Sequence, residues 1–159
     1  MIVWNEDPPL AATPGTLAAG YALHVGVPGI ADYRRLRETS GLTPRSIAAA
    51  EAGLPNSFAG VHVRHGDAVI GMGRIVGDGS LFLHIVDIAV DPLHQGRGIG
   101  RAIVAALLEH IAAHAPAEVY VSLIANRKAH RLYAQFGFGE VTPDARGMAL
   151  WMRGEARTA

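Results

Sequence analysis

The chain has 159 residues, about the length of one domain, with 50% apolar and 18% charged residues, which is a globular composition. Its formal net charge is zero with histidine neutral, so the charge balance gives no reason to expect nucleic acid or an anionic membrane as a partner. The absence of cysteine excludes a disulfide framework, thiolate catalysis and cysteine-ligated zinc.

The first 20 residues are rich in proline, alanine and threonine, and we expect them to form a loose leader. They lack the basic segment and apolar run of a secretory signal, and no stretch of the chain reaches the ~20 apolar residues of a membrane span. We therefore expect a soluble, cytoplasmic protein. A single domain is expected over residues 21–153, followed by a frayed tail at residues 154–159.

Alternation, β-branched residues and bounding turns predict strands over residues 21–27, 58–64, 68–76, 81–90, 118–125, 138–142 and 148–153. Helical periodicity predicts helices over residues 30–39, 44–51, 99–111 and 127–136. We expect Thr43 to cap the second helix, with Pro44 at its first position, and Asn126 to cap the last.

One long helix joins the strands at residues 81–90 and 118–125, so these two strands should be parallel and connected by a right-handed crossover. The hairpins elsewhere make the sheet a mixed one, and the fold class is α+β or mixed α/β.

The stretch Gln95-Gly96-Arg97-Gly98-Ile99-Gly100 lies between the most apolar strand and the long helix. A helix start leaves backbone N–H groups without partners, and glycines let the backbone approach a ligand closely. The stretch is therefore an anion cradle suited to phosphate or pyrophosphate, with Arg97 and Arg101 adding charge, or else a glycine-rich turn without a ligand. It matches neither the dinucleotide fingerprint nor the nucleotide P-loop.

Gln95-x-x-Gly98-x-Gly100, after a strand ending in Ala89-Val90-Asp91-Pro92, resembles the acetyl-CoA signature of the GCN5-related N-acetyltransferases, the GNAT superfamily. The resemblance covers about residues 21–152. It implies a mostly antiparallel twisted sheet flanked by helices, with the acyl-CoA bound where two parallel strands splay apart. The coenzyme contacts that it implies are Ile88, Ala89, Val90, Gln95, Gly96, Arg97, Gly98, Ile99, Gly100, Arg101, Asn126, Ala129, His130 and Leu132.

Acyl transfer to an amine needs a group that takes a proton and a group that supports the leaving thiolate. The string Asn126-x-x-Ala129-x-x-Leu132-Tyr133-x-x-Phe136 resembles the segment in which the family commonly carries a tyrosine beside the thioester sulfur. Tyr133 is thus the candidate acid; the alternative is an aromatic residue that only packs in the core.

His84 is the candidate base, because it falls where several relatives carry a glutamate or a histidine base. Alternation places it on one face with Phe82, Val86, Ile88 and Val90. A core histidine bonded to a carbonyl is the alternative. Asp87 should point to the opposite face and make a structural hydrogen bond, with a base role as the less favoured reading.

The remaining polar residues give weaker signals. His110 and His114 have the spacing of a metal pair, but no third ligand is evident, so we expect no metal and a solvated helix edge. Arg34-Arg35-Leu36-Arg37 reads as a solvated helix face, although one arginine there would suit an acidic acceptor.

The resemblance places the acceptor between residues 30–57 and the loop at residues 142–148, with Tyr33, Leu36, Asn56 and Phe58 as candidate walls. It implies an N-acetyltransferase that passes an acetyl group from acetyl-CoA directly to a primary amine, most simply of a small molecule. The alternatives are acetylation of a protein or peptide, and a CoA-binding regulatory module without turnover. A homodimer is a further expectation from the family.

Overall fold

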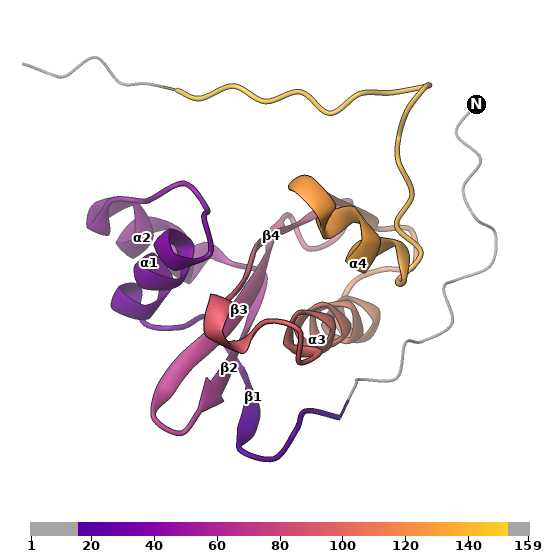
Figure 1. Ribbon diagram of the computed structural model, residues 1–159. Helices are drawn as coiled ribbons and strands as arrows, with labels where there is room; N and C mark the ends of the chain where they lie inside the picture. The colour runs from indigo at the N-terminus through magenta and orange to yellow at the C-terminus, as the bar shows by residue number, and fades with distance from the viewer. Residues whose placement is uncertain (1–15, 153–159) are drawn as a thin grey trace, which may run out of the picture.

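A computed structural model describes residues 16–152 of the chain. Most of the expected leader and the whole of the expected frayed tail lie outside this range, as does Arg153. The described residues form one five-stranded sheet in the order β1-β2-β3-β4-β5, with helices on both of its faces (Figure 1). None of the helices in this range has the length and apolar run that crossing a bilayer requires.

The strands are β1 Tyr21–Val25, β2 Ala59–His65, β3 Ala68–Gly77, β4 Phe82–Val90 and β5 Tyr120–Leu123. The α-helices are α1 Ile30–Thr39, α2 Ile47–Gly53, α3 Ile99–His114 and α4 His130–Ala134. Short 3₁₀ turns are η1 Leu54–Asn56, η2 Pro92–His94 and η3 Arg127–Ala129. The mixed α+β class predicted from the sequence is confirmed.

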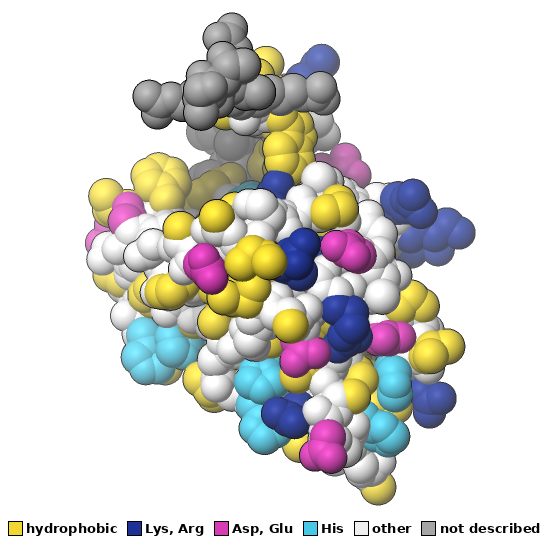
Figure 2. Space-filling model, turned by 90° about the vertical axis from the view of Figure 1, so that its left-hand side faces the viewer, with side chains coloured by type: hydrophobic (Ala, Val, Ile, Leu, Met, Phe, Trp, Pro, Cys, Tyr) yellow, Lys and Arg dark blue, Asp and Glu magenta, His cyan; other side chains and the backbone are white. Residues whose placement is uncertain are grey.

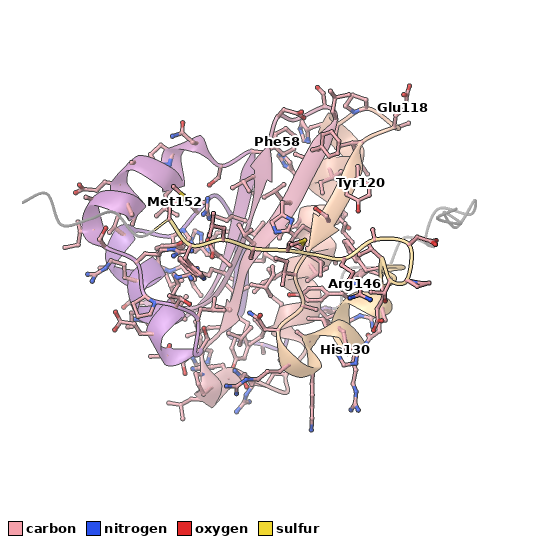
Figure 3. The ribbon with its side chains drawn as sticks, turned by 90° about the horizontal axis from the view of Figure 1, so that it is seen from above. Phe58, Glu118, Tyr120, His130, Arg146 and Met152 are labelled. Atoms are coloured by element: carbon pink, nitrogen blue, oxygen red, sulfur yellow. The ribbon has the colours of Figure 1, made fainter. Side chains whose placement is uncertain are left out.

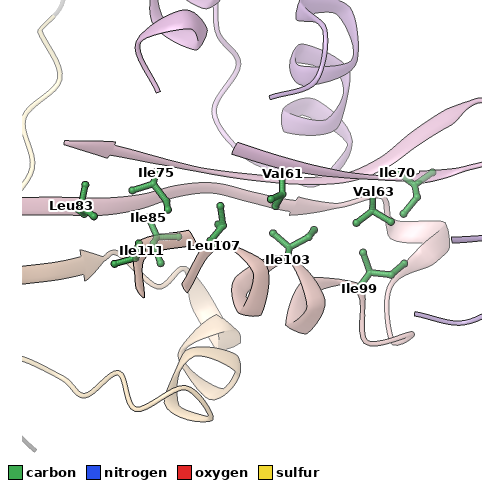
Figure 4. Packing of buried hydrophobic residues seen from close by; sticks show 10 residues of the cluster. All are labelled: Val61, Val63, Ile70, Ile75, Leu83, Ile85, Ile99, Ile103, Leu107 and Ile111. Atoms are coloured by element: carbon green, nitrogen blue, oxygen red, sulfur yellow. The ribbon is translucent and has the colours of Figure 1, made fainter. Parts of the chain in front are cut away.

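Helix α3 covers one face of the sheet and forms the larger core with it (Figure 4). Its apolar stripe places Ile103 and Leu107, both fully buried, against the glycines of β3. A Cβ on Gly73 would lie 2.6 Å from Ile103 and 3.1 Å from Leu107, so the glycine is what lets the helix pack this closely. Gly71 and Gly73 of β3 thus make room for the side chains of α3.

Helices α1 and α2 cover the opposite face (Figure 1). Leu36 of α1, Met72 of β3 and Ala89 of β4 belong to a second, smaller core there. Helix α1 has the predicted bounds. Helix α2 begins later than predicted: Ser46, not Thr43, is its N-cap, because the Ser46 Oγ accepts a hydrogen bond from the Ala49 N–H at 3.1 Å.

Strands β4 and β5 are parallel, as predicted, and all other neighbours in the sheet are antiparallel. Their pairing runs from Phe82 opposite Tyr120 to Ile85 opposite Leu123 and then stops, although β4 continues to Val90. The second half of β4 therefore has a neighbour on the β3 side only.

A β-bulge interrupts β4 in this second half. Val86 is opposite Arg74 and Ala89 is opposite Met72, so Asp87 and Ile88 together face the single residue Gly73. Asp87 has φ of 59°, the left-handed region that aspartate tolerates better than most residues. The bulge overturns the predicted alternation: Ile88 and Val90 pack with the α3 core, while Asp87 contacts α1 on the face that simple alternation assigns to His84.

The two closing strands predicted at residues 138–142 and 148–153 are not formed within the part of the chain that the structure describes. The segment after α4 runs across the molecule to the α1–α2 side, where Met152 lies (Figure 3). Its apolar side chains are exposed, Met148 by 92% and Met152 by 86%. Alternating apolar residues suit a strand, but this segment pairs with no strand of the sheet in the described residues, although β5 is an edge strand.

Candidate active site

The β4–β5 pairing ends at Ile85 and Leu123, and we call the unpaired β5-side edge of β4 beyond Ile85 the gap. The Asp91 N–H donates to the Ile70 carbonyl on the β3 side at 2.8 Å. Since successive residues of a strand direct their peptide groups to opposite neighbours, the groups of Val90 and Ile88 are directed toward the gap. Ala89, opposite Met72, is directed to β3 instead. The Gln95 side chain donates to the Val90 carbonyl at 3.0 Å, which ties the following loop to this wall.

The glycine-rich loop leads from the gap into helix α3. Gly96 has φ of 74° and Gly98, the N-cap, has φ of 76°, conformations that L side chains rarely adopt. No side chain caps the helix, and a Cβ at Gly96 or Gly98 would meet nothing within 4 Å. The N–H groups of the first turn are therefore left without a side-chain cap at the positive end of a 16-residue helix, beside two glycines with open space above them.

Side chains of this loop take different directions. Arg97 is exposed and Ile99 is buried in the core, so only the backbone of Ile99 is available to a ligand. The Arg101 guanidinium donates to Gln135 Oε1 at 2.6 Å and lies 5.7 Å from the Phe136 ring, so it bridges α3 to α4. Gly100 sits close to Leu132 of α4, where a Cβ would lie 3.4 Å from a Leu132 methyl group.

Two contacts that the sequence did not reveal hold the loop at its N-terminal side. His94 Nδ1 lies 2.8 Å from the Tyr21 hydroxyl of β1, the opposite edge of the sheet. Asp91 caps η2 and forms an ion pair of 3.6 Å with Arg35 of α1. The loop is thus fixed from β1, α1 and β4 before any ligand binds.

Tyr133 lies on α4 in a cluster with Val104 of α3, bordered by Ile88 of β4 and Leu123 of β5. The side chain is 7% exposed, and burial raises the pKa of its hydroxyl above the ordinary value of 10.0. Its hydroxyl has no hydrogen-bond partner among residues 16–152, and no fully buried side-chain oxygen there lacks one, so the hydroxyl reaches the surface. A protonated phenol is therefore presented where the two strands separate.

The other α4 candidates are more peripheral. Asn126 is exposed and its side chain does not cap the following turn, contrary to prediction. His130 is exposed, and its Nδ1 lies 3.0 Å from the Arg127 carbonyl oxygen. Ala129 and Leu132 are half-buried and pack beside Tyr133.

His84 lies on β4 at the last stretch of paired strand. Its Nδ1 is 2.9 Å from the Ser122 Oγ of β5, directly opposite in the sheet. Burial lowers the pKa of the imidazole below the ordinary value of 6.5, which keeps the ring neutral at pH 7. Both His84 and Ser122 are half-buried. The partner of His84 is thus a hydroxyl, not the carbonyl of the structural alternative.

Asp87 forms the strongest electrostatic feature of the fold. Its carboxylate accepts from the Tyr33 hydroxyl at 3.0 Å and from Arg74 Nε at 2.5 Å, and it also pairs with Arg37. Arg37 is 5% exposed, so the prediction of a solvated arginine face on α1 is wrong for this residue. The carboxylate and both guanidinium groups are bonded within the fold, which makes Asp87 a structural group.

The four candidate wall residues of the acceptor site do not come together. Leu36 has no exposed surface and packs in the core, so it offers nothing to a substrate. Phe58 packs edge-to-face on His110 of α3, with 5.6 Å between ring centroids, and lies at the other end of the sheet from His130 (Figure 3). Asn56 is exposed and donates to the Ala52 carbonyl. Tyr33 alone lines a cavity, of about 80 Å³, between α1, α2 and β3.

Within the described range, no three histidine or acidic side chains are grouped as a metal site would require. His110 and His114 stack on one another, with 4.1 Å between ring centroids. Their spacing along α3 therefore produces a ring contact.

Comparisons with known proteins show which family and which solved structures the chain is similar to. The model of the acetyltransferase (GNAT) family matches residues 30–138. The structure of a probable acetyltransferase from meticillin-resistant Staphylococcus aureus superposes with a TM-score of 0.80 at 39% identity, covering 83% of this chain and 99% of that one. A GNAT-family acetyltransferase from Streptococcus pneumoniae superposes with a TM-score of 0.69 at 24% identity, covering 85% and 99% of the two chains.

A curated relative, mycothiol acetyltransferase of a Nocardioides species, is 33% identical over 111 residues. That match covers 67% of this chain but only 36% of the relative, so the chain spans about a third of that protein's length.

Proposed function

Because the chain belongs to the GNAT acetyltransferase family, we propose that it transfers an acetyl group from acetyl-CoA directly to the primary amine of a small molecule. The observation that carries this proposal is the main-chain gap between β4 and β5 that opens beside the uncapped glycine loop of α3. The family generally uses acetyl-CoA, and a long, thin thioester arm ending in a diphosphate has the shape that these two features accommodate together.

The residues present fit that coenzyme. Bare amides from Gly96 to Arg101 would hold the diphosphate, since a side chain at Gly96 or Gly98 would occupy the open space above the loop. Peptide groups of Ile88 and Val90 would bond the pantetheine arm in the gap. When bound, acetyl-CoA supplies an activated acetyl thioester. An amide N–H aimed at the acyl oxygen would contribute about 3 kcal/mol in a site of this kind.

His84 would remove the proton from the attacking amine, directly or through water. The Ser122 hydroxyl lies 3.5 Å from the Leu83 carbonyl, to which it donates. The base role requires the tautomer in which His84 Nδ1 carries the hydrogen of the His84–Ser122 bond, so that Nε2 keeps its lone pair as the acceptor. The lowered pKa of His84 keeps the imidazole neutral near pH 7.

Tyr133 would donate to the leaving sulfur. Its raised pKa keeps the hydroxyl protonated across the working range, and that hydroxyl is not engaged by another described residue. The chain contains no cysteine, so no acyl-cysteine intermediate can form, which fits direct transfer.

Calorimetry with acetyl-CoA, followed by a thiol-release assay over amines and peptides, tests the proposal. We expect Tyr133→Phe to lower kcat at least tenfold while the dissociation constant for CoA changes less than twofold. Unchanged turnover would reject the acid role. Binding without thiol release from any acceptor would favour a CoA-binding module, and release with peptides alone would favour protein acetylation. A homodimer and a cytoplasmic location remain predictions.

A further inference from the structure

The face of the sheet that carries His84 also carries the cavity beneath α1 and α2. Its lining is Tyr33, Arg45, Ala49, Ala50, Gly53, Leu54 and Arg74. The volume of about 80 Å³ has room for a few water molecules, which is enough for a carboxylate or phosphate group and too little for a whole ligand.

The charges around this cavity are not balanced. Asp87 is the acidic group next to it, and this one carboxylate is shared by Arg37 and Arg74. Arg45 is half-buried, and its guanidinium forms no ion pair with any described acidic side chain. The ring of Trp151 lies over it, with the guanidinium carbon 4.6 Å from the ring centroid. Within the described range, the three arginines and the one carboxylate therefore sum to an excess of two positive charges.

A half-buried guanidinium with no counter-ion among residues 16–152 has lost hydration that no carboxylate of this range replaces, so an anion entering the cavity would gain a charge-assisted bond at little further cost. The nearby acids do not fill this role. Glu51 of α2 is exposed and Asp32 of α1 is bonded to Arg35. On the face that Figure 2 shows, basic side chains lie among Asp and Glu side chains and form no broad basic surface that would compete with the cavity.

The sheet register gives the separation between this cavity and the candidate base. Arg74 is opposite Val86, and His84 is two residues further along β4 on the same face. Strand rise and spacing then put the backbone of Arg74 roughly 8 Å from that of His84. The candidate base and an arginine of the cavity therefore lie on the same face of the sheet, on neighbouring strands.

We infer that the acceptor is a small primary amine that carries a carboxylate or phosphate, and that Arg45 and Arg74 bind this anionic group. The inference rests on the proposed function for the identity of the amine site. Arg45 is the specificity-determining residue, because Arg74 is already held by Asp87 and Ser57.

Two pairs of amines, each with one anionic and one neutral member, test the inference. With CoA bound, 3-aminopropanoate is titrated against 3-aminopropanamide, and phosphoethanolamine against ethanolamine, by calorimetry. We expect the acidic member of at least one pair to bind tenfold or more tightly. The pair that shows the preference distinguishes carboxylate from phosphate. Equal binding within both pairs would overturn the inference.

Arg45→Gln should abolish this preference while changing the affinity for the neutral probes less than twofold. Arg64→Gln is the matched control, since Arg64 is a half-buried arginine of β2 whose guanidinium bonds only the Asp67 carbonyl. An equal loss in both variants would indicate general electrostatics and overturn the inference. Ala49→Glu places an anion in the cavity lining and should reverse the preference without disturbing the core.

These titrations need no turnover. If no amine releases thiol but the acidic probes bind through Arg45, the proposed function fails and the anion site stands. If thiol is released equally from acidic and neutral amines, and the titrations agree, the transferase stands and the anion site fails.

Discussion

The two faces of the sheet are stabilised by different kinds of interaction. The α3 face is apolar, and Ile and Leu side chains of the helix meet two glycines of β3 (Figure 4). The α1–α2 face holds an apolar cluster too, but at its centre a carboxylate is bonded to two arginines and a tyrosine. The first face fixes the start of α3 and so the proposed diphosphate cradle. The second places charge next to the proposed reaction centre, where it would select the acceptor that we infer.

The bulge of β4 is what allows the two faces to differ. By adding one residue, it turns Ile88 and Val90 toward the α3 core and leaves Asp87 among the side chains of α1. Apolar packing tolerates small shifts, whereas an ion network fails when one member is removed. Substitutions on the two faces should therefore have different costs.

Asp87→Asn should have the largest effect on stability. Asparagine tolerates the positive φ of this position, so the change removes charge without straining the backbone. It leaves Arg37 and Arg74 without their shared counter-ion, and breaking a buried pair in this way costs about 4 kcal/mol. Urea unfolding gives the value. Asp67→Asn, in the exposed β2–β3 turn, is the control and should change it by less than about 0.5 kcal/mol.

Leu107→Ala probes the apolar face and should have a somewhat smaller effect. Leu107 is fully buried between α3 and β3, and truncation of such a leucine costs about 3 kcal/mol. Glu109→Ala on the exposed side of the same helix is the matched control. If the Asp87 variant proves more stable than the Leu107 variant, the ionic network is not what holds the second face together.

The smallest expected effect is on the pH dependence of the free energy of unfolding. Because burial lowers the pKa of His84, the unfolded chain takes up a proton as the pH falls through about 6.5 while the folded chain does not. Wild-type stability should therefore fall more between pH 7.5 and 5.5 than that of His84→Gln, as unfolding midpoints at both pH values would show. Parallel loss in the two proteins would mean that His84 does not titrate differently on folding.

If His84 is the base, its removal should also change how activity depends on pH. His84→Ala should lose most near neutral pH, and the loss should shrink as the pH rises, since free amine then forms without a base. A defect of the same size at every pH would indicate a structural histidine. The pH dependence of kcat/KM for both proteins distinguishes the two.

Local pattern predicted much of this fold. The bounds of α1 follow from Pro28-Gly29 before it and Ser40-Gly41 after it, and the parallel β4–β5 pair follows from the long helix between the two strands. Motif spacing indicated the glycine loop and drew attention to Tyr133. These features depend on residues adjacent in sequence, which is why the chain alone reveals them.

The rest depends on partners distant in sequence. The bulge at Asp87 is defined by two residues standing opposite one on β3, and nothing in the order of residues 84–90 shows that. Arg37 was expected in solvent because its counter-ion lies 50 positions away. The predicted closing strands failed for a related reason: alternation describes a residue's suitability for a strand and says nothing about whether a neighbour is present.

The early end of the β4–β5 pairing has a consequence for hydrogen–deuterium exchange. The N–H groups of Ile88 and Val90 have no strand beyond them, so in the free protein they should exchange quickly while that of Ala89, protected by β3, exchanges slowly. A thioester arm lying in the gap would slow both fast amides. Isotope uptake at these two amides, compared with that of Ala89 between them, would then report occupancy of the gap without any assay of turnover.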